Sequence, residues 1–216
     1  MSFYGPDIYT EAESDNDTLA NLGPLTLMAG VWEGTKGADQ HPAAAGDERE
    51  PYVEHYDLQP IDPQTNGPQL FYGLRYHTHI TRPGEVETFH DQVGYWLWEP
   101  AAQAVTFTLG IPRGQVLLAS GPATPDARRF ELEAAVGSEV HGILSNPFLD
   151  ANFRTLSYRI IVTLDPEHDS WSYESEGLLQ TPDQERPFRH VDANALVRAS
   201  APRPNPLAST GINTGS

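Results

Sequence analysis

Histidine is the side chain of this sequence best suited to hold a metal or a haem iron. The chain of 216 residues has eight histidines and no cysteine, and its two methionines are Met1 and Met28. Without cysteine there is no disulfide, no iron–sulfur cluster, no thiolate metal site and no cysteine nucleophile. If the protein binds a transition metal or a haem iron, neutral imidazole must be the main ligand.

His90 lies in the segment FHDQVGYWLW, in which residues of two kinds alternate. The alternation predicts a strand and puts His90 and Gln92 on the same face as Trp96 and Trp98. If that face points inward, the histidine and the glutamine share a pocket with two indoles. If it points outward, the segment is an ordinary amphipathic strand. The residues alone leave both interpretations open.

His190 lies in FRHVDANALVR, near the end of the last predicted strand. Alternation places His190, Asp192, Asn194 and Leu196 on one face of this strand. From the periodicity alone, a solvated polar face is favoured over a ligand site.

A third group of histidines approaches the pattern of a cupin metal site. His77 and His79 are followed by Glu85 and His90, and cupins bind a metal inside a barrel with two histidines, a glutamate and a later histidine. The spacing from His79 to Glu85 is longer than usual, and TRPG predicts a hairpin turn between them. An exposed strand face is the favoured interpretation.

The segment GVWEGTKG brackets Trp32 with three glycines. Glycines let the backbone pass close to another element or to a ligand, while the indole closes a barrel end. A strand start with a packed tryptophan explains the segment equally simply and is favoured when it is taken alone. The signatures of serine hydrolases, P-loop proteins, Rossmann folds and zincins are absent from the sequence.

The elements that carry these residues are predicted to be strands, because alternation continues from Val31 to Arg198. Turn signals separate roughly ten strands by hairpin-length loops, which predicts an antiparallel barrel or sandwich. After the first strand, the predicted strands are Pro51 to Leu58, Gln69 to Ile80, Val86 to Trp98, Gln103 to Leu109, Gln115 to Ala119, Arg129 to Ala135, Val140 to Leu144, Phe153 to Leu164, Trp171 to Leu178 and Pro187 to Arg198.

The sequence predicts one domain over residues 19–200. A short helix is expected near Leu19 to Met28, where Pro24 interrupts it. An acidic N-terminus, residues 1–18, and a tail rich in proline and serine, residues 201–216, are expected to be disordered.

The formal net charge of −17 limits the partners of the protein. A surface so acidic repels the phosphates of nucleic acids and of anionic membranes, so we expect neither as a partner. No window approaches the roughly 18 consecutive apolar residues of a spanning helix, and the N-terminus lacks the features of a signal peptide. A cytoplasmic protein is expected, and the oligomeric state stays open, with a homodimer among the outcomes.

Four segments, in their order along the chain, resemble motifs of the nitrobindin family of haem-binding β-barrels. GVWEGTKG is similar to G-x-W-x-G-x-G, and EPYVEHYDL to Y-P-T-[IV]-x-x-F. FHDQVGY is similar to H-x-E-x-G-Y, and RHVDANALVR to the terminal H-L-x-x-x-L-x-R. Together they span about Leu22 to Arg198, nearly the whole predicted domain.

This resemblance implies an all-β, ten-stranded antiparallel barrel, similar to lipocalins and fatty-acid-binding proteins, that holds haem b with ferric iron. It implies that the haem binds nitric oxide and isomerises peroxynitrite to nitrate. His190 matches the axial iron ligand, with Asp192 as one candidate acceptor for its Nδ1–H if Nε2 binds the iron. The further cofactor-binding candidates are His90, on the distal side, and Trp32, Thr35, Tyr52 and Arg154.

The sequence departs from the family pattern in three places. Tyr52 stands where the family usually has a small hydroxyl residue lining the haem pocket, and Gln92 replaces an acidic residue. The segment ADQHPAAAGDERE is interpreted as an insertion beside that pocket. Two alternatives therefore stay open: a carrier of an apolar small molecule, with Tyr72, Tyr76, Trp96 and Trp98 as its binding surface, and the cupin-like metalloenzyme.

Overall fold

The computed structural model describes residues 4–43 and 46–209, with strands as its dominant elements. The strands are β1 (Gly30–Ala43), β2 (Gly46–Pro60), β3 (Gln64–Asn66), β4 (Gln69–Thr81), β5 (Thr88–Glu99), β6 (Ala104–Ile111), β7 (Gln115–Pro122), β8 (Arg129–Val136), β9 (Gly142–Ser145), β10 (Arg154–Asp165), β11 (Ser170–Gln180) and β12 (Phe188–Ser200). The helical elements are α1 (Thr18–Asn21), the 3-10 helix η1 (Gly23–Met28), α2 (Pro147–Asn152) and α3 (Pro206–Ser209). None of these helices is long and apolar enough to span a bilayer.

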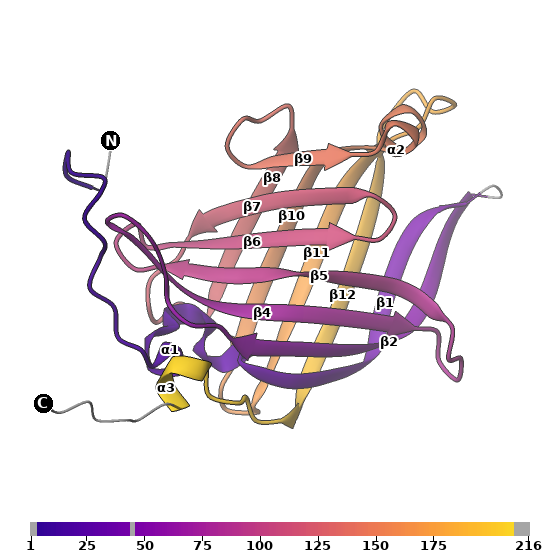
Figure 1. Ribbon diagram of the computed structural model, residues 1–216. Helices are drawn as coiled ribbons and strands as arrows, with labels where there is room; N and C mark the ends of the chain where they lie inside the picture. Colours follow the sequence, from indigo (N-terminus) through magenta and orange to yellow (C-terminus); the bar gives the residue numbers. More distant parts are fainter. Residues whose placement is uncertain (1–3, 44–45, 210–216) are drawn as a thin grey trace, which may run out of the picture.

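The strands form a closed barrel, which confirms the predicted fold class (Figure 1). Their order around the wall is β2-β1-β12-β11-β10-β8-β9-β7-β6-β5-β4, and the pairing of β2 with β4 closes the ring. β3 pairs with β4 outside this ring. One pairing departs from the antiparallel expectation, because the short β9 runs parallel to β8. The ring encloses an interior, although the β2 residues before Val53 pair with β1 alone.

The expected strands all form, and the structure adds longer first strands, the short strand β3 and the helices α2 and α3. β1 and β2 extend into the two ends of the segment interpreted as an insertion, so that Asp39 pairs with Glu50; residues 44 and 45 of this segment lie outside the described range. α2 was not predicted, although its sequence carries the start signal of a helix. Asn146 caps α2 by accepting a hydrogen bond from the Leu149 backbone N–H at 2.9 Å, and Pro147 occupies the first turn.

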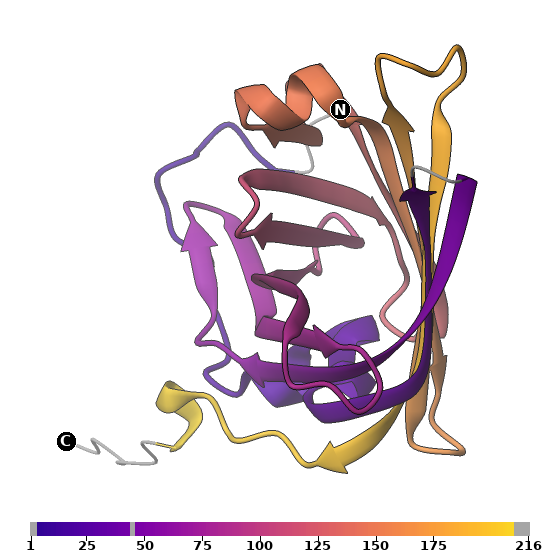
Figure 2. The same cartoon turned by 90° about the vertical axis from the view of Figure 1, so that its right-hand side faces the viewer.

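One end of the barrel is closed by α1 and η1 (Figure 2). The expected helix near Leu19 to Met28 forms as these two short pieces, and Asp17 caps the first by accepting a hydrogen bond from Ala20 N. Leu22, Leu25 and Met28 are fully buried beneath this cap. Trp32 packs edge-on against Trp171 and donates from Nε1 to the Met28 carbonyl at 2.7 Å. This end of the interior is therefore filled by side chains.

Both chain ends lie against the barrel within the described range. The backbone N–H of Asp15 donates to the Tyr72 hydroxyl at 3.1 Å, and Tyr4 donates to Glu99. The fully buried Asn205 accepts from the Thr18 backbone N–H at 3.0 Å. These polar contacts attach residues within 4–18 and 201–209 to the barrel, and the disorder expected of the two ends stays a prediction. Residues 1–3 and 210–216 lie outside the described range.

Replacing Trp32 with alanine should lower the free energy of unfolding by about 3–5 kcal/mol, because it leaves a cavity beside Trp171 and removes the ring over which the Arg198 guanidinium lies, 4.1 Å from the ring centroid. Denaturant titration measures this loss. The matched control is Tyr95→Ala on the outer face, expected to cost less than about 1 kcal/mol. Equal effects of the two substitutions would contradict the assignment of Trp32 to the core.

Candidate functional site

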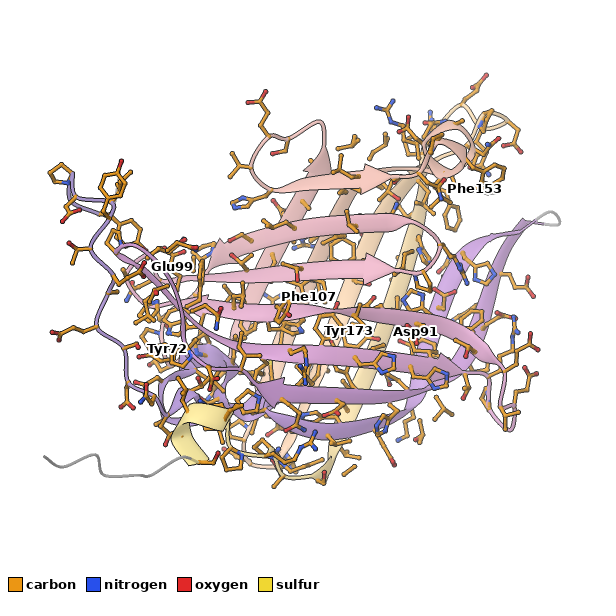
Figure 3. The ribbon with its side chains drawn as sticks, in the orientation of Figure 1. Tyr72, Asp91, Glu99, Phe107, Phe153 and Tyr173 are labelled. Carbon is orange, nitrogen blue, oxygen red and sulfur yellow. The ribbon has the colours of Figure 1, made fainter. Side chains whose placement is uncertain are left out.

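The other end of the barrel opens into a cavity of about 530 Å³. This volume lies within the roughly 300–1,000 Å³ of small-molecule sites. Apolar side chains form much of its wall, with Phe107 deep in the barrel and Phe153 beside α2 at the mouth (Figure 3). Polar side chains gather in two places, one beside the mouth on β1 and β12 and one deeper, around Tyr173. The cavity can therefore hold a largely apolar molecule and contact it with a few polar groups.

A β-bulge in β1 decides which residues of this strand face the cavity. Between Gly34 and Gly37, β1 advances three residues while β2 advances two, from Glu54 to Tyr52. The extra residue shifts the alternation, so that Asp39 and His41 point inward. A Cβ atom on Gly37 would collide with the Tyr52 ring, so only glycine fits there.

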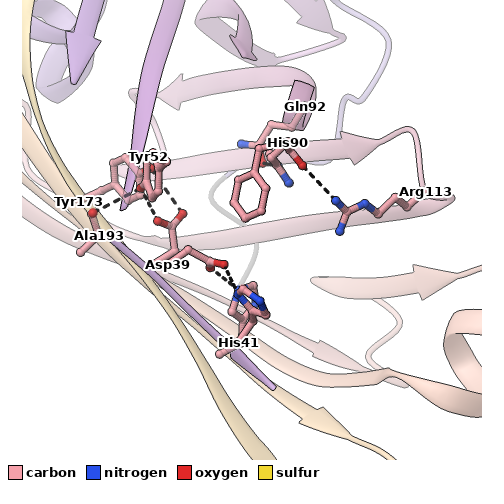
Figure 4. A network of polar contacts seen from close by, with 11 residues as sticks. Asp39, His41, Tyr52, His90, Gln92, Arg113, Tyr173 and Ala193 are labelled. Atoms are coloured by element: carbon pink, nitrogen blue, oxygen red, sulfur yellow. Dashed lines mark hydrogen bonds and ion pairs between the residues drawn. The ribbon is translucent and has the colours of Figure 1, made fainter. Parts of the chain in front are cut away.

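Asp39 joins two histidines at the mouth of the cavity (Figure 4). Its Oδ1 lies 2.6 Å from His190 Nε2 on β12, and its Oδ2 lies 2.7 Å from His41 Nδ1. Burial alone would raise the pKa of Asp39, but the hydrogen bonds and charges of His190 and His41 hold it below its ordinary value. An ionised carboxylate only accepts, so His190 donates from Nε2 and His41 donates from Nδ1.

His90 reaches the same cavity from β5, with β4, β2 and β1 between its strand and β12. Its Nε2 lies 3.1 Å from Gln92 Oε1. Burial lowers the pKa of His90 and the charge of Arg113 lowers it further, against the opposing effect of the hydrogen bond to Gln92. His90 is therefore held as neutral imidazole, the form that binds metals and donates one hydrogen bond.

A chain of hydrogen bonds crosses the deeper polar part of the cavity wall. Tyr52 bonds to Asp192, and its hydroxyl oxygen lies 2.8 Å from that of Tyr173. Tyr173 in turn lies 3.0 Å from Glu54 Oε2, which also accepts from Asn194 Nδ2 at 2.8 Å. The three oxygen–oxygen contacts of this hydrogen-bonded series share only two hydroxyl protons, those of Tyr52 and Tyr173. A third proton on one of the carboxyl groups completes the chain.

The two carboxyl groups have the pKa values that such sharing requires. Burial, together with the charge of Asp192, raises the pKa of Glu54 to about 8. Burial also raises the pKa of Asp192 to about 6, although the hydrogen bond from Tyr52 opposes the shift. Near neutral pH the pair therefore holds one proton, mainly on Glu54, which avoids two unpaired negative charges inside the barrel.

Three of the residues expected at the site line the cavity together, namely His190, His90 and Tyr52. The other three lie elsewhere. Trp32 packs in the closed end, and Thr35 is exposed within the bulge. Arg154 is half exposed and pairs with Asp150 at 3.2 Å.

The cupin-like arrangement does not form. His77 and His79 lie on the outer face of β4, where His77 Nε2 bonds to Asp91 at 2.8 Å and His79 Nε2 to Thr88 at 3.0 Å. His90 lies on the inner face, because its strand pairs it with the inward Ile80. Within residues 4–43 and 46–209, no cluster of histidine and carboxylate side chains is arranged to hold a metal ion by itself.

Asp39, His41 and Glu54 line the cavity but were not among the residues expected at the site. Asp192 was one candidate acceptor for the Nδ1–H of His190, but its carboxylate bonds to Tyr52, while Asp39 accepts from His190 Nε2. Unbroken alternation from Trp32 would point Asp39 outward. Its inward orientation can be predicted from the sequence only if Gly34 and Gly37 are taken as the limits of a bulge.

Glu54→Gln should change how stability depends on pH. The raised pKa means that the folded protein keeps a proton that the unfolded chain has already lost, so the free energy of unfolding falls as pH rises toward 8 and levels off above it. His90, with its lowered pKa, acts in the opposite direction only below about pH 6.5. From pH 6.5 to 8 the fall should approach 1.4 kcal/mol per pH unit, to order of magnitude.

Urea titrations at each pH measure this slope for the two proteins. The glutamine keeps an acceptor oxygen and has no titrating proton, so its curve should be nearly flat across this window. The same slope in both proteins would show that Glu54 is not the group that titrates.

The comparisons with known proteins agree with this architecture. A crystal structure of Rv2717c from M. tuberculosis superposes with a TM-score of 0.57 at 21% sequence identity, covering 84% of this chain and 96% of that one, which shows a shared fold. None of the curated proteins compared matches the chain. The family model for the THAP4-like, heme-binding beta-barrel domain matches residues 21–198, from the end of α1 to the end of the last strand. This chain therefore belongs to the THAP4-like family of haem-binding β-barrel domains.

Proposed function

We propose that the cavity binds haem b and that His190 is the axial ligand of its ferric iron. The observation that carries this proposal is the meeting of His190 and His90 in one cavity, in a chain of a haem-binding family. Imidazole is a common axial ligand of haem iron. The two histidines reach this cavity from β12 and β5, which three other strands separate around the wall, so a ligand in the cavity can contact both.

The residues of the cavity fit this group in three respects. The histidines supply nitrogen ligands, and the apolar wall, with Leu109, Ile111 and Phe153, suits a porphyrin face. Arg113 stands at the mouth, where its Nη2 donates to the Phe89 carbonyl at 3.0 Å, and its remaining donors suit a haem propionate. One contact must change on binding, because Asp39 holds the Nε2 atom of His190.

Ferric haem supplies a Lewis-acidic centre at which nitric oxide and peroxynitrite bind. The protein positions that centre, excludes water with its apolar wall and presents the neutral His90 to whatever binds on the distal side. Isomerisation of peroxynitrite to nitrate conserves atoms and charge, so the protein needs neither to donate nor to accept a proton. Its contribution is then to position the anion, to exclude water and, at His90, to donate a hydrogen bond to the reacting anion.

A carrier of an apolar small molecule is the second candidate, and the aromatic interior favours it. Tyr76, Trp96 and Phe107 pack against one another, with Trp96 and Phe107 at a centroid distance of 4.2 Å. Trp96 and Phe107 also line the cavity. Binding of an apolar dye that survives His190→Ala, in a protein that takes up no hemin, would support this function over the first.

Titration of the protein with hemin tests the haem site. The wild type should develop a Soret band that saturates at one equivalent. His190→Ala should weaken binding by more than about 100-fold, because even the loss of a partner outside the coordination shell costs about 10–100-fold. His77→Ala is the matched control, a histidine of the outer wall that also pairs with an aspartate, and it should bind as the wild type does. Equal binding by all three proteins would reject His190 as the ligand.

His90→Leu tests the proposed reaction separately from haem binding. The leucine keeps an apolar side chain and removes the imidazole that faces the distal side, so hemin should still bind through His190. The rate of peroxynitrite isomerisation, followed by stopped-flow absorbance, should fall by about 10–100-fold if the His90 Nε2–H turns from Gln92 Oε1 to the reacting anion and stabilises it. An unchanged rate would remove His90 from the reaction, and no reaction in the hemin-loaded wild type would refute the isomerase activity.

A further inference from the structure

The atom of His190 best placed to bind a haem iron is already engaged by Asp39. Nδ1 is bonded to the ring carbon that carries Cβ, so a porphyrin plane approaching Nδ1 meets the histidine's own Cβ. Nε2 has no such neighbour and is the atom that can approach iron at the centre of a flat macrocycle. In the structure this Nε2 lies 2.6 Å from Asp39 Oδ1, with its proton donated to the carboxylate.

We propose that Asp39 is a latch on the haem site, which must release His190 before the iron can bind, and that it thereby sets how fast and how tightly haem is taken up. This inference rests on the proposed function, since it concerns the same iron ligand. The bond from His190 to Asp39 and the bond from His190 to iron use one nitrogen, so they exclude each other. Haem uptake therefore has to overcome the strength of the Asp39 bond.

The surroundings of Asp39 make the latch strong when it is closed. Asp39 is 8% exposed, and a charge-assisted hydrogen bond away from water is stronger than one at the surface. The bulge in β1 aims the carboxylate at β12, where Asp39 and Asp192 are partners in the register. Asp192 itself turns to Tyr52, which leaves His190 to Asp39.

His41 gives the latch an open state of acceptable energy. It holds the second carboxylate oxygen at 2.7 Å, so Asp39 keeps one charge-assisted partner after His190 has left. Without that partner, opening would leave a buried anion unpaired, which is a costly state. The two positions of His190, on Asp39 and on iron, are therefore both accessible to the protein.

Stopped-flow uptake of hemin by the wild type, Asp39→Ala and Asp39→Asn tests this proposal. Asp39→Ala removes the acceptor and should raise both the association rate and the affinity by about tenfold or more, as expected for the loss of a competing hydrogen bond to a charged group. Asp39→Asn keeps a neutral acceptor oxygen and should lie between the other two. Asp91→Asn, on the outer wall beside His77, is the matched control and should behave as the wild type.

Histidine ring NMR of the haem-free proteins gives a readout that is independent of haem. The wild type should show the signal of a His190 Nε2–H proton in a strong hydrogen bond. Asp39→Ala should lose that signal, while its backbone chemical shifts should still show the same strands. Asp39→Asn provides the same comparison if the alanine variant does not fold.

The outcomes separate this inference from the function on which it rests. Faster and tighter uptake by Asp39→Ala, with the NMR signal of the latch lost, supports the latch. Uptake that is equal in all variants, or slower in Asp39→Ala, overturns the latch and leaves the haem site standing. Failure of every variant, the wild type included, to bind hemin overturns the haem site and the latch together.

Discussion

The extra residue in β1 between Gly34 and Gly37 is the constraint on which the candidate site depends. Before it, β1 points Trp32 into the filled end of the barrel, and after it, β1 points Asp39 toward β12. Without the bulge the carboxylate would face solvent, and His190 would lose its partner. A local change of register in one strand therefore separates a core built for packing from a cavity built for binding.

The interior shows the same division in its charges. The closed end holds leucine, methionine and tryptophan, whereas the deeper wall of the cavity holds Glu54 and Asp192 linked through two tyrosines. Burying two carboxyl groups is costly, and sharing one proton between them limits that cost. Apolar side chains in these positions would stabilise the fold at least as well as this network does. We therefore associate the network, which lies on the cavity wall, with ligand binding.

Much of the fold was accessible from the sequence, because half-buried strands impose a period of two and hairpin turns have recognisable residues. The strands from β4 to β8 and from β10 to β12 follow directly from that period. The orientation of His90 did not, since alternation gives two faces and only pairing with β4 decides which is inside. The parallel pairing of β9 depends on contacts between distant segments. Asp39 was not predicted to face the cavity, because the bulge reverses the alternation of inward and outward residues in β1.

The central claim is that the cavity between β5 and β12 holds haem through His190. A crystal structure of the protein grown with hemin tests it most directly. We expect a porphyrin in the cavity, with its iron bonded to His190 Nε2 and with Asp39 hydrogen-bonded to His41 alone. A porphyrin outside the barrel, or an iron bound by another side chain while His190 stays on Asp39, would contradict it.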